Sequence, residues 1–300
     1  MRELSGSALQ SNFIGLAIMD NANPFFADLA RGAEEASYEA GFSVLLTDSG
    51  QLQAREDANL LLFKELRVRG LILAAIGDGA ASVARLRPEF PVVLAARSGA
   101  TGSHCTVWVD DITGGRLAAA HLIGQGHRRL AAVGGTTGLE QVTRRREGAA
   151  AVAMEHPDVT LLVISTDSMD VPAGRLAAEE IALMPGTVRP TGIFAANDLI
   201  AIGLLQGLVG HGLRVPQDVA IIGYDDIEFA SAAAVPLSSI RQPRHEIGRR
   251  AAQLLLIEIE ASERGEEHLH EQSVFAPELV VRASTSFIAG GRQGHRRRSG

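Results

Sequence analysis

The sequence contains one cysteine, few aromatic residues and no excess of positive charge. Cys105 is the only thiol among 300 residues, and Phe, Trp and Tyr together make up 4% of the chain. One thiol cannot form a disulfide within the chain, so an oxidising compartment is not required. Lys and Arg number 28 against 35 Asp and Glu, which gives a net charge of −7. This balance is the opposite of the basic surface that nucleic-acid-binding domains usually carry.

Long apolar runs are also absent. No run approaches the roughly 20 apolar residues that a membrane-spanning helix needs. Residues 1–12 lack the apolar core of about 7–15 residues that characterises a signal peptide. We therefore expect a cytoplasmic protein without a membrane partner.

Several motifs of common enzyme chemistry are missing. The chain has no Gly-Lys-Ser/Thr phosphate loop, no His-Glu-x-x-His and no Gly-x-Ser-x-Gly. A glycine-rich turn at residues 134–138 follows an apolar run, but it does not read Gly-x-Gly-x-x-Gly. His104 and Cys105 are neighbours, and neighbouring side chains point to opposite faces of a strand. We expect no enzyme, no cofactor and no metal site.

The chain does contain a repeated alternation of short apolar runs and helical patterns. Such runs occupy residues 13–19, 44–46, 70–74, 91–95, 106–109, 130–133, 160–164, 192–195 and 219–223. This alternation predicts an α/β fold with parallel sheets and right-handed crossovers. A length of 300 residues favours about two domains. No low-complexity linker divides the middle of the chain, so the two halves should be joined by short crossings.

Two of these apolar runs end in polar residues. The run at residues 193–196 is followed by Asn197 and Asp198, and the run at 219–223 is followed by Tyr224, Asp225 and Asp226. In an open parallel sheet, ligands bind beyond the carboxyl ends of the strands. Neither Asn197 nor Asp225 has an obvious reactive partner, which favours holding a molecule over transforming it.

An ordered set of motifs extends along nearly the whole chain. It includes Ile14-Gly15-Leu16, Asn23-Pro24-Phe25-Phe26, Leu29-Ala30-Arg31-Gly32, His121 to Arg129, Phe194-Ala195-Ala196-Asn197-Asp198, Gly212 to Val219, Gly223-Tyr224-Asp225-Asp226, Arg241-Gln242-Pro243 and Pro277 to Arg282. With these motifs the chain resembles the effector-binding core of the LacI/GalR family of bacterial transcription regulators. The resemblance covers residues 12–287.

The resemblance implies the type I periplasmic-binding-protein-like fold, in which two Rossmann-like parallel-sheet lobes flank a hinged ligand cleft. The implied divisions are a linker remnant at 1–11, an N-terminal lobe of 12–109 plus 241–266, a C-terminal lobe of 110–240 plus 267–288, and a disordered tail at 289–300. In the family, ligand binding closes the cleft, and a homodimer transmits closure to helix-turn-helix heads on operator DNA. We thus expect the ligand-sensing core of a repressor.

The chain departs from the family at its start. The N-terminal helix-turn-helix is missing from the sequence as given, so we expect operator binding only where such a head is present. The tail carries Arg292, Arg296, Arg297 and Arg298. A solvated disordered tail and an accessory polyanion contact are both compatible with this pattern.

Asp225, Asn197 and Arg145 are the predicted polar ligand-binding residues of the C-terminal lobe. By its motif position, Asp225 is the family's sugar-hydroxyl acceptor, although an Asp at a strand end can also cap a helix. Asn197 offers a donor and an acceptor, with capping left to Asp198 or performed by Asn197 itself. Arg145 stands where the family places a ligand-binding arginine, although a solvated helix face is the alternative.

The N-terminal lobe supplies Asn23, Phe25 and Phe26 as predicted ligand contacts. One phenylalanine should form an apolar platform and the other should belong to the core, and the sequence does not distinguish them. Asn21 is a weaker candidate. Where many relatives carry Asp, this chain has Ala96, so the first lobe should offer one carboxylate fewer. Arg97 should face the cleft or pair with Asp110.

The implied effector is a small polar molecule: a sugar or sugar derivative, a polyol or a nucleobase-like compound. The alternative function is that of a sugar solute-binding protein serving a transporter, which shares the fold. The absence of a signal-peptide pattern and the linker-like residues 1–12 count against it.

Overall fold

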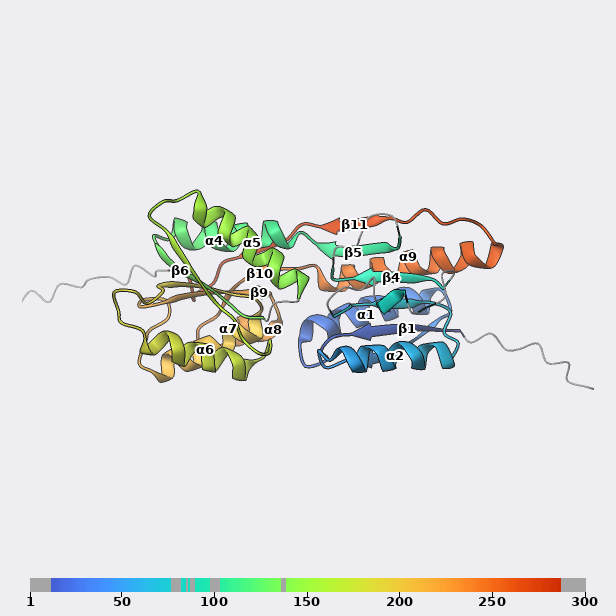
Figure 1. The fold of residues 1–300 in the computed structure, drawn as a ribbon, viewed down its shortest axis with the longest axis horizontal. Coiled ribbons are helices and arrows are strands. Elements are labelled where there is room, and N and C mark those ends of the chain that lie inside the picture. Colours follow the sequence, from blue (N-terminus) through green and yellow to red (C-terminus); the bar gives the residue numbers. More distant parts are fainter. Residues whose placement is uncertain are drawn as a thin grey trace, which may run out of the picture.

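The chain folds into two lobes, each built on a six-stranded sheet (Figure 1). The computed structural model describes residues 12–76, 82–84, 86, 90–97, 103–135 and 139–286. The predicted linker remnant at 1–11, the tail at 289–300 and residues 136–138 of the glycine-rich turn lie outside these ranges. In the part of the chain that is described, no helix has both the length and the apolar character needed to cross a bilayer.

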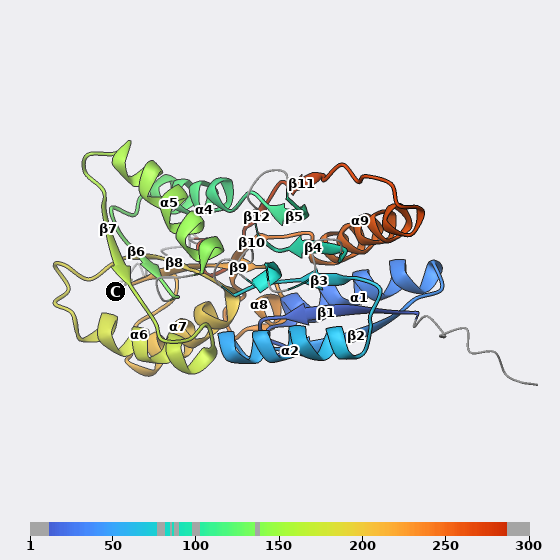
Figure 2. The ribbon, with the colours of Figure 1, turned by 45° about the vertical axis from the view of Figure 1, so that its right-hand side comes forward.

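The first lobe contains a parallel sheet in the order β11-β5-β4-β3-β1-β2. Its strands are β1 (Phe13–Ile18), β2 (Ser43–Asp48), β3 (Leu71–Leu73), β4 (Val92–Ala95), β5 (Cys105–Val109) and β11 (Gln272–Phe275). Its helices are α1 (Pro24–Glu39), α2 (Gln53–Glu65) and α9 (Arg244–Arg264). Helices α1 and α9 cover one face of the sheet and α2 covers the other (Figure 2).

The second lobe contains a sheet in the order β12-β10-β9-β8-β6-β7. Its strands are β6 (Arg129–Val133), β7 (Thr160–Ile164), β8 (Gly192–Ala195), β9 (Ala220–Asp225), β10 (Ser238–Arg241) and β12 (Glu278–Val280). Its helices are α4 (Asp111–Gly124), α5 (Glu140–Met154), α6 (Val171–Leu183), α7 (Asp198–Gly210) and α8 (Glu228–Ala232). Only β12 runs antiparallel to its neighbour among the strand pairs of the described residues.

Alternation along the strands divides each core into two layers. In the first lobe, Leu16 and Ile72 face α1 and α9, whereas Ala17 and Leu71 face α2. Strands buried on both faces read as continuous apolar runs, which is why these runs were visible in the sequence. The predicted α/β fold with two parallel-sheet lobes is confirmed.

The chain crosses between the lobes three times: after β5, after β10 and after β11. Two predicted boundaries are wrong. Arg241 pairs with Asp225 in the second sheet, so the second crossing follows it. The segment 267–288 does not belong wholly to the second lobe, because β11 pairs with β5 in the first sheet. A strand at residues 273–276 is expected from the sequence, but the sequence does not show which sheet edge it joins, and β11 lies at the edge of the first sheet.

Helices α1 and α9 pack with their backbones in contact. A Cβ atom on Gly248 would lie 1.9 Å from the carbonyl oxygen of Leu29, and one on Gly32 would lie 2.0 Å from that of His245. Such distances leave no room for a side chain, so the approach of the two helices depends on glycine. The α9 helix then reaches Arg264 and ends at Gly265, whose φ of 67° is left-handed.

We expect Gly248→Ala to lower the free energy of unfolding by about 1–3 kcal/mol, because overpacking forces the helices apart. Urea unfolding monitored by circular dichroism measures the effect. The matched control is Gly124→Ala at the end of α4, where a Cβ meets no atom within 4 Å. That variant should be neutral or slightly stabilising. Equal unfolding midpoints for the two variants would contradict a backbone contact between α1 and α9.

Candidate ligand-binding site

The carboxyl ends of strands from both lobes border one cavity, whose empty space is about 560 Å³ when the adjoining open solvent is included. Its wall is formed by residues at or just beyond the ends of β1, β4, β8, β9 and β10, together with nearby loops and α5. The lining residues are Met19, Asp20, Asn23, Phe25, Phe26, Gln51, Ala96, Leu139, Gln141, Arg145, Met169, Asn197, Asp225 and Gln242. All six predicted ligand-binding residues are among them.

Asp225 is a buried carboxylate that receives hydrogen bonds from both lobes. Asn23 at the start of α1 donates through Nδ2 to Oδ2 over 3.2 Å. Gln242, at the crossing after β10, donates through Nε2 to Oδ1 over 2.7 Å. Burial raises the pKa of Asp225, while Arg145 and these amides oppose the rise. The residue has a left-handed φ of 102°, a strained conformation that aims its carboxylate into the cavity wall.

Arg145 is held on α5 by three kinds of contact in a buried site. Its Nε donates to Asp111 Oδ1 over 2.7 Å, and its Nη1 donates to the carbonyl oxygen of Ala196 over 2.7 Å. The guanidinium carbon lies 3.6 Å from the centre of the Tyr224 ring. Nη1 also lies 3.9 Å from Asp225 Oδ1. Burial acts to lower the pKa of Arg145, but Asp111 and the other nearby groups raise it overall, so the side chain stays charged.

Close helix packing brings Arg145 to Asp111. A Cβ atom on Gly115 of α4 would lie 1.9 Å from the carbonyl oxygen of Arg145, and one on Gly148 would lie 2.0 Å from that of Ile112. The backbones of α4 and α5 therefore touch at both points. This contact places the arginine beside the first residue of α4, so Arg145 is not the solvated helix residue that the alternative interpretation predicted.

Asn197 caps helix α7 and also lines the cavity. Its Oδ1 accepts from the backbone N–H of Ile200 over 2.9 Å, and its Nδ2 donates to the carbonyl oxygen of Met169 over 2.9 Å. The expectation that capping is left to Asp198 is wrong. Asp198 instead accepts from Ser239 Oγ and from the N–H of Ile227, which links α7 to β10 and α8.

The first lobe places Asn23 and two aromatic rings on the opposite wall. Asn23 caps α1 by accepting from the N–H of Phe25, which leaves its Nδ2 to reach Asp225. Phe25 and Phe26 both line the cavity, and both belong to the buried cluster under α1. Their ring centres are 5.0 Å apart at an angle of 88°. The expected division into one platform residue and one core residue is therefore wrong, because each ring both lines the cavity and packs in the core.

Comparisons with known proteins agree with this architecture. Residues 119–285 match the family model of the periplasmic binding protein-like domain. The chain is 33% identical over 251 residues to the ribose operon repressor of Escherichia coli K12, covering 82% of this chain and 75% of that protein. It is 31% identical over 284 residues to the HTH-type transcriptional regulator DegA of Bacillus subtilis 168, covering 92% and 82%.

A solved structure of a LacI family transcriptional regulator from Enterococcus faecalis V583, with bound ribose, matches with a TM-score of 0.80. Identity to that protein is 32%, with coverage of 91% of this chain and 98% of that chain. This chain belongs to the LacI family of transcriptional regulators. The relatives are regulators and not enzymes, which confirms the expectation of a non-enzymatic protein.

Ala96 sits on the cavity wall of this LacI-family chain, as its motif position implied. The first lobe nevertheless supplies a carboxylate from another position, because Asp20 follows β1 and lines the same wall. Gln51 Nε2 donates to Asp20 Oδ2 over 3.2 Å. Arg97 pairs with Glu140 of α5 at 2.9 Å, a contact between the lobes that was not predicted.

Gln242 is the main polar residue that sequence reasoning missed. It lies in the Arg241-Gln242-Pro243 motif, so the signal was present, but the position was read only as part of the resemblance. Its role depends on β10 ending beside β9, where Arg241 pairs with Asp225. Gln141 and Met169 come from loops and helix starts, where the sequence pattern gives no direction for a side chain.

We expect Asp111→Ala to lower the free energy of unfolding of the second lobe by about 3 kcal/mol, because Arg145 would lose the main partner of a buried charge. The control is Glu155→Ala, which removes an exposed partner of Arg116 between the same two helices. That loss should be at most about 1 kcal/mol. Urea titration measures both changes, and a small effect of Asp111→Ala would show that the buried pair contributes little to stability.

Proposed function

We propose that this chain is the ligand-sensing core of a LacI-type repressor and that it binds a sugar of monosaccharide size in the cavity between its lobes. Family membership supports the regulatory role. The nature of the ligand is supported by the ribose-bound relative and by the ribose operon repressor. The cavity is lined by polar groups among apolar side chains, the composition that small-molecule sites usually have.

The observation that carries the proposal is the buried carboxylate of Asp225 beside the guanidinium of Arg145. An ionised carboxylate accepts hydrogen bonds at about four lone-pair positions, and Asn23 and Gln242 use two of them. Arg145 has five N–H groups, some of which lie beyond its bonds to Asp111 and Ala196. Acceptor and donor groups side by side match the vicinal hydroxyls of a sugar, and bonds to charged groups are the strong ones.

The apolar part of the cavity wall suits the C–H face of a sugar ring. Phe25, Phe26, Met19, Leu139 and Met169 give apolar contact around the polar groups. A site with this mixture holds a ring by its apolar faces and orients it by its hydroxyls. No histidine or cysteine is found among the residues that line the cavity in the described structure.

Contacts between the lobes connect binding to conformation. Asn23 reaches Asp225, Arg97 pairs with Glu140, and Arg244 of α9 donates to the carbonyl oxygen of Asp226 over 2.6 Å. A sugar held by both walls favours the closed arrangement, since a ligand shifts an equilibrium toward the state it binds better. Transmission of closure through a homodimer to operator DNA is part of the proposal and rests on family membership.

We expect Asp225→Asn to weaken sugar binding by about 10- to 100-fold, the equivalent of one charged hydrogen bond. Isothermal titration calorimetry with D-ribose first, then pentoses, hexoses, polyols and nucleobases, identifies the ligand and measures the loss. Circular dichroism checks that the fold is retained. The control is Asp158→Asn, an exposed residue of the same lobe paired with Arg128. Unchanged affinity in the Asp225 variant would contradict this site.

Arg97 and Glu140 form a contact that holds the closed state, so a double-mutant cycle tests closure. We expect Arg97→Ala and Glu140→Ala each to weaken sugar binding about fivefold, the effect of roughly 1 kcal/mol lost from the bound state. If the two residues act through each other, the double variant should bind the sugar no more weakly than either single variant does. Additive losses would indicate that the residues act separately.

A further inference from the structure

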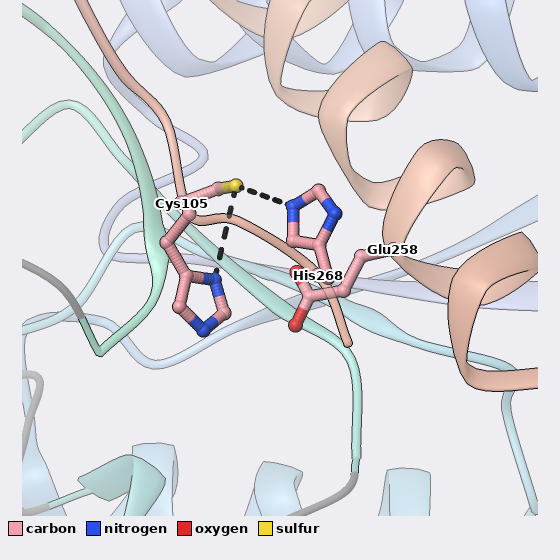
Figure 3. Close-up of side chains that lie close together, drawn as sticks. Cys105, Glu258 and His268 are labelled. Atoms are coloured by element: carbon pink, nitrogen blue, oxygen red, sulfur yellow. Dashed lines mark hydrogen bonds between the residues drawn. The ribbon is translucent and has the colours of Figure 1, made fainter. Parts of the chain in front are cut away.

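Four metal-ligating side chains meet at the end of the first sheet that lies away from the cavity. Cys105 begins β5, Glu258 lies on α9, and His268 and His270 lie on the segment between α9 and β11. One ligand atom from each residue lies within 4.8 Å of those of the other three. Figure 3 shows the thiol between two imidazole rings, with Glu258 beside His268.

The distances are close to those of a metal coordination shell. Cys105 Sγ lies 3.2 Å from His268 Nε2 and 4.0 Å from His270 Nδ1. Around tetrahedral zinc, bonds of about 2.0–2.3 Å place neighbouring ligand atoms roughly 3.3–3.6 Å apart. The two observed distances lie on either side of that range, and no two of the four ligand atoms are more than 4.8 Å apart.

A second observation points to a missing partner. Glu258 is 9% exposed, and its Oε2 has no hydrogen-bond partner among the described residues. A buried carboxylate oxygen without a partner is unfavourable, and a bound cation removes that cost. Burial raises the pKa of Glu258 to about 7, against a smaller lowering by the backbone N–H of Val92.

The donor set selects the type of metal. A thiolate and two imidazoles favour borderline and soft ions, whereas Mg²⁺ and Ca²⁺ prefer oxygen ligands. Zinc accepts sulfur, nitrogen and carboxylate oxygen in a four-coordinate site. The backbone N–H of Glu271 already donates to Cys105 Sγ over 3.2 Å, which holds the sulfur atom in position.

We propose that Cys105, Glu258, His268 and His270 form a structural Zn²⁺ site. The ion joins the segment after α9 to the first residue of β5, and so fixes the start of β11 before the chain makes its third crossing to the second lobe. The site is separate from the cavity, because Cys105 is at the amino end of β5 and the cavity lies beyond the carboxyl ends of the strands.

The proposed ligands are far apart in the sequence, which is why the sequence predicted no metal site. The adjacent His104 and Cys105 point to opposite faces of a strand, so this pair alone forms no site. The two histidines that approach the thiol are 163 and 165 residues away along the chain. Only the pairing of β11 with β5 brings them together.

The test uses the full chain, stripped with a chelator and titrated with Zn²⁺ against a chromophoric zinc indicator. We expect one Zn²⁺ per chain. Cys105→Ser and His268→Gln should each weaken binding by about 100-fold or more. Cobalt(II) substitution should give a thiolate-to-metal charge-transfer band that Cys105→Ser abolishes. The control is His104→Gln, since His104 lies near His270 but bonds to Ser103 and is outside the ligand set.

Three results would overturn the proposal: no stoichiometric Zn²⁺ binding by the unaltered chain, Zn²⁺ affinity in Cys105→Ser or His268→Gln that equals that of the unaltered chain, or a cobalt spectrum of the unaltered chain without the thiolate band. Circular dichroism of the metal-free variants shows that they fold. Hydrogen exchange supplies an independent readout, because a structural ion should slow exchange at residues 266–271 in the unaltered chain and not in Cys105→Ser.

Discussion

The buried carboxylate of Asp225 is the constraint on which the two-lobed structure depends. A charge removed from water needs compensation, and here it comes from Asn23 in one lobe, Gln242 at a crossing, and Arg145 in the other lobe. Arg145 belongs to the same lobe as Asp225, and Gln242 follows the strand beside it, so only the bond from Asn23 depends on the approach of the lobes. The Asp225 carboxylate therefore accepts a hydrogen bond from the opposite lobe and also has positions left to accept bonds from a ligand. Closure of the lobes and recognition of the ligand thus depend on the same side chain.

Glycine contacts between helices determine where the compensating groups stand. The backbone contact of α4 with α5 puts Arg145 beside Asp111 and over Tyr224. The equivalent contact of α1 with α9 accompanies a bond from Arg244 to Asp28 of α1, and Arg244 also donates to the Asp226 carbonyl oxygen of the second lobe. A methyl group at either contact would separate the helices. Glycines that line no part of the cavity thus determine where Arg145, a cavity residue, is placed.

Features that depend only on the local sequence pattern were predicted. Strands buried on both faces appear as apolar runs, and the polar residues beyond their carboxyl ends predicted Asn197 and Asp225 on the cavity wall. Features set by strand order were not predictable. The partly buried β11 was assigned to the wrong lobe, and its pairing with β5 assembles the Cys105 cluster. Gln242 reaches Asp225 only because β10 lies beside β9.

Apart from Asn23, which caps α1, the polar side chains of the two cavity walls are held differently, which bears on specificity under the proposed function. In the second lobe, Arg145 is fixed by Asp111 and Ala196, and Asn197 is fixed by the cap of α7 and by Met169. These groups are already oriented, so they bind without reordering. In the first lobe, Ala96 offers the cavity no polar side chain, while Asp20 and Gln51 stand on loops and bond to each other. That pair can exchange its mutual bond for bonds to a ligand, so discrimination between sugars should arise mainly at the first-lobe wall.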